Sequence, residues 1–187
     1  MTDRYAVLGN PIGHSKSPLI HGLFAQATGQ DIAYTAIEVP LDGFSETVLA
    51  FRAGGGRGLN VTLPFKLQAF EIATDPSERA RLAGAANCLK FDGERILADN
   101  FDGVGLVNDL QRNLGCPLAG KRVLLLGAGG ATRGALLPIA AEGPALIAVA
   151  NRTAGKAHAL QRDFAAHAQL QSGGYDDLGG QRFDVVI

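Results

Sequence analysis

Residues 121–134, KRVLLLGAGGATRG, decide the fold of the second half of the chain. An apolar strand over Lys121–Leu126 runs into a glycine-rich turn, Gly127–Gly130, and a helix opens at about Ala131. Glycines let a phosphate approach the backbone closely, and the amide groups of a helix N-terminus bind anions. Thr132 replaces the third glycine of the usual fingerprint, so an ordinary strand–helix turn is the alternative. The pattern favours a dinucleotide-binding domain.

The segment after the next strand indicates which dinucleotide is bound. NAD-binding domains carry an acidic residue about 20 positions on, which binds the ribose 2′-hydroxyl. Here the strand over 145–150 ends in NRTAGK, which contains no carboxylate. Arg152 suits a 2′-phosphate by charge and by stacking on adenine, and Asn151, Thr153 and Lys156 lie beside it. We therefore predict NADP rather than NAD, with a solvated basic loop as the alternative.

The first hundred residues alternate strands and helices. Strand-like segments occupy 4–9, 32–39 and 58–61, and the helix-like segments 17–29 and 44–55 separate them. Two short helices and a hairpin around Asp92–Gly93 follow. The alternation predicts an α/β fold with a mainly parallel sheet. We expect a substrate-binding catalytic domain over 1–102, a bridging helix and linker over 103–120, and the N-terminal half of a Rossmann NADP-binding domain over 121–187.

Polar residues follow several of the strands in the first half. Open α/β sheets bind ligands at the carboxyl ends of their strands, so these residues predict a binding site. Four of them also have a structural alternative. Thr62, Ser17 and Asp102 suit helix N-caps, and Lys66 suits a solvated helix surface. The residues are Ser15 and Ser17, then Asn60, Thr62 and Lys66, then Asn87, and finally Asp99, Asn100 and Asp102.

The composition argues against several function classes. The net charge of −1 gives no electrostatic case for nucleic acid or an anionic membrane. No apolar run approaches the ~20 residues of a membrane span, and the N-terminus does not resemble a signal peptide. Cys88 and Cys116 lack metal-ligand spacing, and His14 and His21 lack a third ligand. We expect a cytoplasmic protein with a small-molecule substrate and no metal.

Six ordered motifs together carry a family resemblance. They are GNPIGHSKSP (9–18), NVTLPFK (60–66), GAANC (84–88), DNFDGVG (99–105), GAGGATRG (127–134) and NRT (151–153). In this order they closely resemble the shikimate dehydrogenase family, and the resemblance extends over residues 5–187. It implies an enzyme that reduces 3-dehydroshikimate to shikimate with NADPH, in aromatic amino-acid biosynthesis, as a monomer or homodimer.

The resemblance also implies roles for individual residues. Ser15 and Ser17 would hold the substrate carboxylate, and Lys66 and Asp102 would be the catalytic pair, since hydride transfer to a ketone makes an alkoxide that needs a proton. The residues that would hold the ring hydroxyls are Asn60, Thr62, Asn87 and Asp102. Those that would hold the cofactor are Gly127, Ala128, Gly129, Gly130 and Ala131 at the pyrophosphate, and Asn151, Arg152, Thr153 and Lys156 at the 2′-phosphate.

The chain departs from the family pattern at three places. Phe101 stands where the family has threonine, next to Asp102, and Cys88 replaces another threonine. A doubly wound domain has about six strands, and this one ends after its third or fourth, which predicts a C-terminally incomplete chain. The sequence therefore leaves three hypotheses. They are an NADP-dependent shikimate dehydrogenase whose 187 residues alone are inactive, a quinate/shikimate enzyme with another cofactor preference, and a non-catalytic nucleotide-binding remnant.

Overall fold

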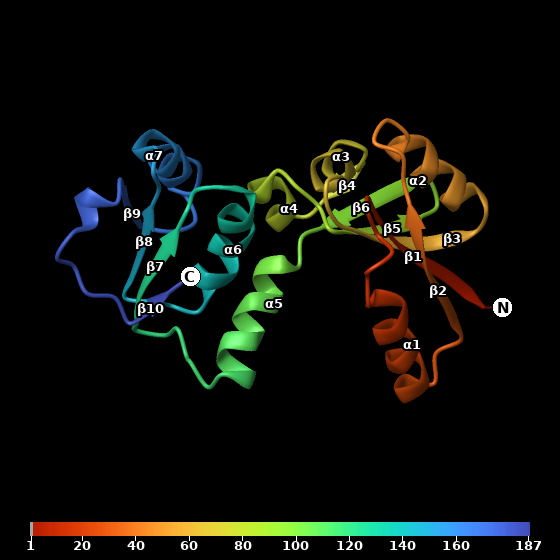
Figure 1. Ribbon diagram of the computed structural model, residues 1–187, viewed down its shortest axis with the longest axis horizontal. Helices are drawn as coiled ribbons and strands as arrows, with labels where there is room; N and C mark the ends of the chain where they lie inside the picture. Colours follow the sequence, from red (N-terminus) through yellow and green to blue (C-terminus); the bar gives the residue numbers. More distant parts are fainter. Residues whose placement is uncertain (1) are drawn as a thin grey trace. The chain divides into compact units, whose positions relative to one another are not determined.

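The computed structural model describes residues 2–187, and they form two compact units that meet between Asn100 and Phe101 in the sequence. The division falls after Asn100, so Asp102 belongs to the second unit, whereas the sequence placed it in the first domain. Each unit is built on its own sheet (Figure 1). None of the helices formed by residues 2–187 combines the length and apolar character that a membrane crossing requires.

The first unit is a six-stranded sheet in the order β2-β1-β3-β5-β6-β4. Strands β1, β2 and β3 run parallel, while β5 forms antiparallel ladders with β3 and β6. The mainly parallel α/β fold is therefore as predicted. The strands are β1 (Asp3–Gly9), β2 (Ile32–Glu38), β3 (Gly56–Val61), β4 (Asp75–Pro76), β5 (Cys88–Asp92) and β6 (Arg95–Asp99), and the helices are α1 (Ser17–Thr28), α2 (Phe44–Ala53), α3 (Lys66–Glu71) and α4 (Glu78–Ala83).

The core of this unit lies between the sheet and the helices α2 and α3. Phe44 of α2 stacks on Phe65, with ring centroids 5.1 Å apart, and both side chains are buried against Leu8 and Leu59 of the sheet. The apolar side chains of α1 are exposed instead, for example Phe24 at 59%. The packing on α2 and α3 holds the carboxyl ends of β1 and β3 together, and the predicted substrate residues follow these ends.

The second unit is a four-stranded parallel sheet in the order β10-β7-β8-β9. The elements of the second unit are α5 (Asp102–Asn108), the π-helical turn η1 (Asp109–Asn113), β7 (Arg122–Leu126), α6 (Gly130–Ala141), β8 (Leu146–Ala150), α7 (Ala154–Asp163), β9 (Leu170–Gly173), the 3₁₀ turn η2 (Asp176–Leu178) and β10 (Val185–Val186). The strand–glycine turn–helix sequence predicted around residue 127 is thus present as β7 and α6.

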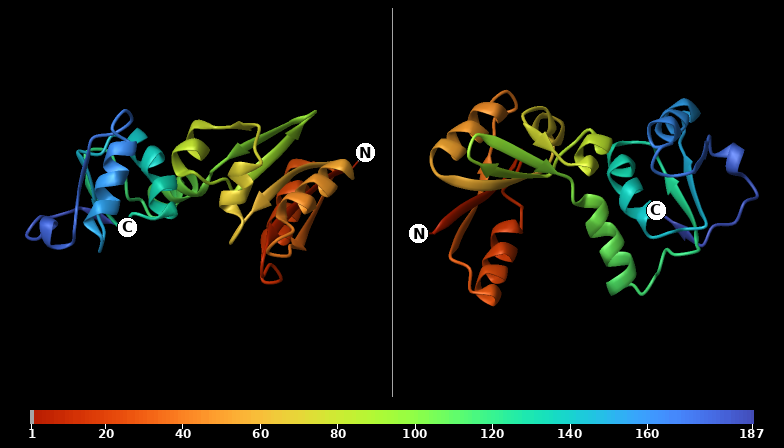
Figure 2. Two further views of the ribbon diagram at one scale, coloured as in Figure 1. Left: turned by 90° about the horizontal axis from the view of Figure 1, so that it is seen from above. Right: turned by 180° about the vertical axis from the view of Figure 1, so that it is seen from behind.

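Helix α5 packs closely on α6, as both views in Figure 2 show. The contact depends on Gly103, because a Cβ atom at this position would overlap the carbonyl group of Gly134 and the backbone of Ala135. Because glycine has no Cβ atom, the two helix backbones can approach each other this closely. Since Asp102 is the first residue of α5, this contact sets its place within the second unit.

Candidate active site

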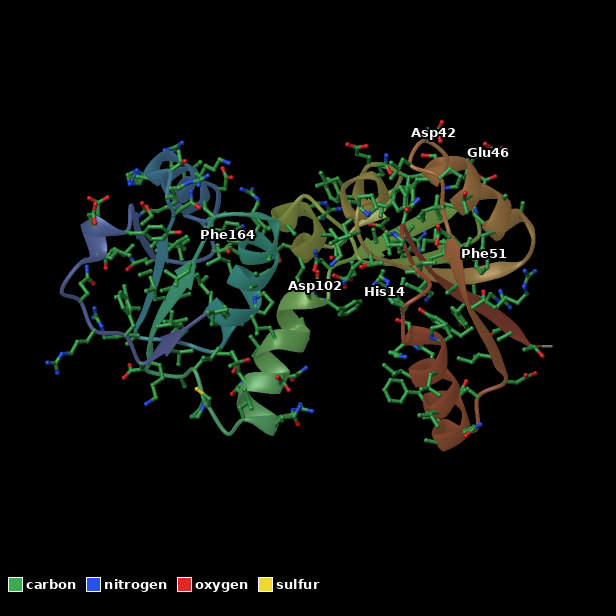
Figure 3. The ribbon with its side chains drawn as sticks, in the orientation of Figure 1. His14, Asp42, Glu46, Phe51, Asp102 and Phe164 are labelled. Carbon is green, nitrogen blue, oxygen red and sulfur yellow. The ribbon has the colours of Figure 1, made fainter. Side chains whose placement is uncertain are left out.

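Ser15 and Ser17 lie at the start of α1, and the structure corrects the N-cap role predicted for Ser17. The helix begins at Ser17 itself, with Lys16 in the N-cap position. The Ser15 hydroxyl accepts the backbone N–H of Ser17 at 3.3 Å, while the Ser15 N–H donates to the Ile12 carbonyl at 2.9 Å. This turn folds Ser15 back over the first amide of the helix, which has no backbone partner of its own. The Ser15 hydroxyl therefore accepts the first amide of α1, although Ser15 itself is not the N-cap residue. His14 precedes it in the same loop (Figure 3).

Asn60, near the end of β3, is joined to two other elements by its side chain. Its Oδ1 accepts a 2.7 Å hydrogen bond from the Tyr34 hydroxyl of β2. The Tyr34 ring stacks in turn on His21 of α1, with centroids 4.1 Å apart and planes 6° from parallel. A phenol between β3 and α1 thus holds the Asn60 amide in one orientation.

Tyr34 and His21 adjoin the predicted site, and the sequence reasoning gave them no role there. Burial is the main reason why the pKa of Tyr34 lies well above its ordinary value, the charge of Cys88 adds to the rise, and a hydrogen bond with Ser17 opposes it. Burial also lowers the pKa of His21. The sequence feature that could have identified Tyr34 is its place on the less exposed face of an alternating strand. A partly buried tyrosine there needs a hydrogen-bond partner for its hydroxyl.

Asn87 lies beside Asn60 in the structure. Its carbonyl accepts the Val61 N–H at 2.9 Å and the Nδ2 group of Asn60 at 3.4 Å, and its own N–H donates to the Asp99 carbonyl. Two asparagine side chains therefore belong to adjacent segments at the end of β3. Through Tyr34, the structure connects Ser17 to the same cluster.

Lys66 is the first residue of α3, but the helix starts differently from the prediction. Thr62 does not cap it. The Thr62 carbonyl accepts the Phe65 N–H at 3.0 Å in a separate turn, and Phe65 occupies the N-cap position without a side-chain cap. The ring of Phe65 is buried in the core, and α3 begins at the next residue, Lys66. Lys66 still lies at the N-terminal end of its helix, and its carbonyl accepts the Ala86 N–H at 2.8 Å.

The carboxylate of Asp99 binds other residues of the first unit, although the sequence placed Asp99 among the ligand-binding residues. Its carboxylate accepts hydrogen bonds from the Ser77 hydroxyl at 2.6 Å, from the Arg79 guanidinium at 3.1 and 2.5 Å, and from the Asn100 N–H at 2.7 Å. Burial raises the pKa of Asp99, but these donors outweigh it and hold the pKa below the ordinary value. Asn100 is buried, and its Nδ2 donates to the Ala85 carbonyl at 3.2 Å.

Asp102 begins α5 but is not its cap, because Phe101 occupies the N-cap position. Phe101, where the family has threonine, is 45% exposed. Lys66 belongs to the first unit, so the two residues of the predicted catalytic pair belong to different units. The π-helical turn that continues α5 makes this segment a single helical connection up to Asn113.

The glycine turn after β7 has the geometry of a phosphate-binding loop. Gly127 has φ +110°, a conformation that side chains disfavour, and its N–H donates to the Ala150 carbonyl at 2.7 Å. Cβ atoms at Gly129 and Gly130 would meet no atom within 4 Å, so the space above the start of α6 is open to a ligand. Thr132, in place of a third glycine, donates its hydroxyl to the Gly127 carbonyl at 2.8 Å and closes the turn.

The residues predicted to face a 2′-phosphate gather at the N-terminus of α7. Asn151 is the first residue after β8, Arg152 and Thr153 are exposed, and Lys156 is exposed in the first turn of the helix. Two cationic side chains and a helix N-terminus favour an anion at this place. Together with the open glycine turn, these residues fit an NADP molecule.

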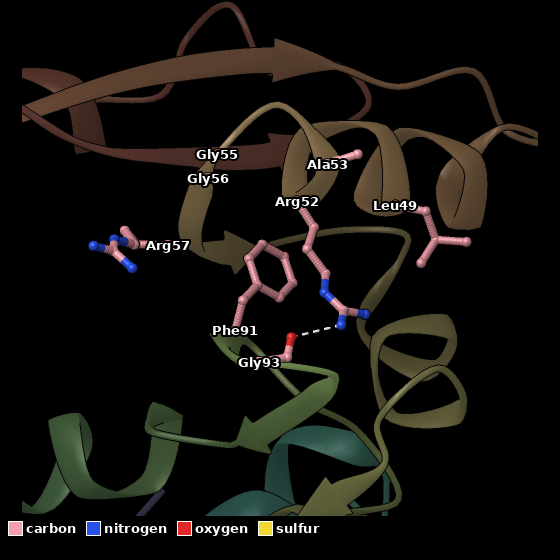
Figure 4. Close-up of a pocket in the computed structure, with 8 residues that line it drawn as sticks. All are labelled: Leu49, Arg52, Ala53, Gly55, Gly56, Arg57, Phe91 and Gly93. Atoms are coloured by element: carbon pink, nitrogen blue, oxygen red, sulfur yellow. Dashed lines mark hydrogen bonds between the residues drawn. The ribbon is translucent and has the colours of Figure 1, made fainter.

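The first unit contains two pockets that differ in whether the predicted substrate residues line them. One of about 710 Å³ includes Tyr34 and Asn60 in its lining, so it adjoins the predicted substrate residues. The other, of about 420 Å³, lies where β3 begins, and there Arg52 donates to the Gly93 carbonyl at 2.6 Å (Figure 4). It contains none of the predicted site residues. Within residues 2–187, no group of three His, Cys, Asp or Glu side chains is placed to hold a metal ion.

Comparison with known proteins agrees with this arrangement over both units. Residues 7–89 match the family model of the shikimate dehydrogenase substrate binding domain, and residues 109–187 match that of shikimate / quinate 5-dehydrogenase. A relative from Nitrosospira multiformis, named shikimate dehydrogenase (NADP(+)), is 56% identical over 187 residues, which are 100% of this chain and 68% of the relative. The chain belongs to the shikimate dehydrogenase family. The resemblance read from the six motifs is thereby confirmed.

Solved structures support the family assignment at the level of the fold. An Ael1 enzyme from Pseudomonas putida superposes with a TM-score of 0.95 at 58% identity, over 99% of this chain and 68% of that one. Shikimate 5-dehydrogenase from Thermus thermophilus, solved in complex with NADP(H) and shikimate, has a TM-score of 0.80 at 33% identity, over 91% of this chain and 62% of that one. The chain thus spans about two thirds of the length of these relatives.

Proposed function

We propose that this protein catalyses the NADP-dependent, reversible reduction of 3-dehydroshikimate to shikimate. The observation that carries the proposal is the 56% identity, over the whole chain, to a relative named NADP-dependent shikimate dehydrogenase. The basic segment after β8 favours this reading over a quinate enzyme that prefers NAD, because it offers no carboxylate to a ribose 2′-hydroxyl. We further propose that the protein works in the cytoplasm as a monomer or homodimer.

The substrate would be held by the polar cluster of the first unit. Ser15 and Ser17 lie at the N-terminal end of α1, where hydroxyl and amide groups favour a carboxylate. Asn60 and Asn87 lie side by side and offer amide groups to ring hydroxyls, with Thr62 following on the same strand end. The hydrogen bond from Tyr34 to Asn60 supports this role, because a binding amide must be held in one orientation before the substrate arrives.

The cofactor would lie along the glycine turn and the N-terminus of α7, with the amides of Gly129, Gly130 and Ala131 at the pyrophosphate and Arg152 at the 2′-phosphate. NADPH, when bound there, supplies the hydride that reduces the ketone. Lys66 and Asp102 would then act as the catalytic pair on the oxygen that gains charge, by giving it a proton or by stabilising the charge until a proton arrives. Asp102 would also contact a ring hydroxyl.

Substitution of the pair tests this mechanism in the full natural chain. We expect Lys66→Ala and Asp102→Asn to lower kcat by roughly 100-fold or more, the usual weight of acid–base assistance. The double variant should be little worse than the worse single one, since paired groups act as a unit. Lys121→Ala, at the residue directly before β7 and therefore at the far end of this strand from the glycine turn, is the matched control and should keep normal turnover. Near-normal kcat in the Lys66 variant would return this lysine to a solvated surface role.

A further inference from the structure

Asn151 connects the two loops that surround the proposed cofactor site. Its Oδ1 accepts the backbone N–H of Ala128, in the glycine turn, at 3.2 Å. Its Nδ2 donates to the Thr153 carbonyl at 2.9 Å. That carbonyl also accepts the Lys156 N–H at 3.0 Å, which is the first turn of α7. One carboxamide therefore joins the turn that precedes α6 to the turn that begins α7.

The orientation of this carboxamide is determined by its partners. A flipped amide would set its NH₂ group against the Ala128 N–H and its oxygen against the Thr153 carbonyl, and both contacts would be repulsive. The backbone of Asn151 is held as well, since its N–H donates to the Gly173 carbonyl of β9 at 3.1 Å. Both polar atoms of the side chain, Oδ1 and Nδ2, therefore have hydrogen-bond partners within the protein.

This arrangement changes which groups meet the cofactor. The Ala128 amide is directed at Asn151, so it is not directed at the pyrophosphate as the family resemblance implied. The Gly127 amide is engaged by the Ala150 carbonyl in the same way. The amides of the first turn of α6 are the ones that a helix leaves without backbone partners. The connection by Asn151 sets where these amides lie relative to Arg152, which directly follows it in the chain.

We propose that Asn151 is a positioning residue for the cofactor, and that it sets the spacing between the pyrophosphate turn and the 2′-phosphate loop. This inference rests on the proposed NADP-dependent function. Because the connection acts through the glycine turn, which NADP and NAD would share, Asn151 contributes to the affinity for both cofactors equally. Discrimination between the two cofactors belongs to Arg152, whose side chain is exposed.

Binding of NADPH and NADH to the full natural chain, measured by calorimetry, separates positioning from direct contact. We expect Asn151→Ala to weaken both cofactors by a similar factor of about ten, since hydrogen bonds at both ends of the carboxamide are lost. Arg152→Gln is the contrasting variant, and it should weaken NADPH while leaving NADH unchanged. In Asn151→Asp the carboxylate still accepts the Ala128 N–H, so NADH binding should recover in part, while its negative charge keeps NADPH weak.

Hydrogen exchange at the Ala128 amide provides a second measurement that does not depend on the cofactor. The exchange should be faster in Asn151→Ala than in the unaltered protein, and it should be slow again in Asn151→Asp. Loss of NADPH binding alone in Asn151→Ala would show a direct phosphate contact and overturn the inference, as would unchanged binding of both cofactors. Failure of the unaltered protein to bind either cofactor would instead overturn the proposed function, and with it this role.

Discussion

The hydroxyl of Tyr34 donates a 2.7 Å hydrogen bond to Oδ1 of Asn60, across 26 positions of the sequence. Burial keeps the pKa of Tyr34 well above its ordinary value, so the phenol stays protonated and remains a donor throughout the pH range in which such enzymes work. This hydrogen bond fixes the orientation of the Asn60 amide group, which lies beside Asn87. The relationship links α1, β2 and β3 at the proposed substrate site.

Removal of this hydroxyl should weaken substrate binding more than it weakens the fold. We expect Tyr34→Phe to lower shikimate affinity about fivefold, which corresponds to one hydrogen bond of about 1 kcal/mol, and to leave NADPH affinity unchanged. Calorimetric titration with each ligand measures both effects. Tyr175→Phe, at an exposed tyrosine of the second unit, is the control. Equal shikimate affinity in the two variants would contradict a role for Tyr34 at the substrate site.

The ion pair between Arg79 and Asp99 should make stability depend on pH. Because the folded-state pKa of Asp99 lies below its ordinary value, its contribution is present above pH ~4, where the unfolded chain also carries the charge, and is lost as the pH falls toward the folded-state pKa. We expect Arg79→Met to lower the free energy of unfolding by about 1.5–3 kcal/mol at pH 7, and by less at pH 3.

Urea unfolding at both pH values, followed by circular dichroism, checks this expectation. Arg57→Met is the matched control, because the pair that Arg57 forms with Asp3 is 61% and 42% exposed. Exposed pairs contribute about 0–1 kcal/mol. A difference between unaltered protein and Arg79→Met that does not shrink in acid would show that Arg79 acts by packing and not by its charge.

The contact between α5 and α6 gives a prediction with a control in the same helix. Gly103→Ala should destabilise the second unit by about 1–3 kcal/mol, because the added methyl group overlaps the Gly134 carbonyl and the helices must separate. Gly105→Ala adds the same methyl group where no atom lies within 4 Å, and it should stabilise the unit by about 0.4–1 kcal/mol. Thermal unfolding of both variants measures the opposite signs, and a stable Gly103→Ala protein would refute the close approach.

Cofactor preference should depend on the charge of Arg152. Arg152→Asp replaces attraction to a 2′-phosphate by repulsion, so we expect NADPH affinity to fall at least about tenfold. NADH affinity should change little, because NADH has no phosphate at this position. Arg162→Asp, an exposed arginine in the last turn of α7, makes the same charge change at the far end of the helix and serves as control. Similar losses for both cofactors would place the 2′-phosphate elsewhere.

Much of the fold was readable because its signals are local. The glycine turn after β7, the Gly29 stop of α1 and the Gly93 hairpin each depend on a few neighbouring residues whose allowed backbone angles differ from those of other residues. Alternation of strand and helix then predicts parallel pairing, and parallel pairing brings strand ends to one edge of the sheet. These steps use only short stretches of chain.

What the sequence by itself determined was therefore the α/β class, the dinucleotide-binding turn, the basic loop after β8 and the segments that carry the proposed site. The tertiary structure alone decided which polar groups meet. Tyr34 reaches Asn60 because β1 pairs with both β2 and β3 in a fixed register. The Ser15 hydroxyl accepts the first amide of α1 because one loop folds back over the helix. Asn151 is turned toward Ala128 by the approach of two loops 23 positions apart. Hydrogen bonds form only at short range and with suitable angles, so they depend on packing that no short stretch of sequence encodes.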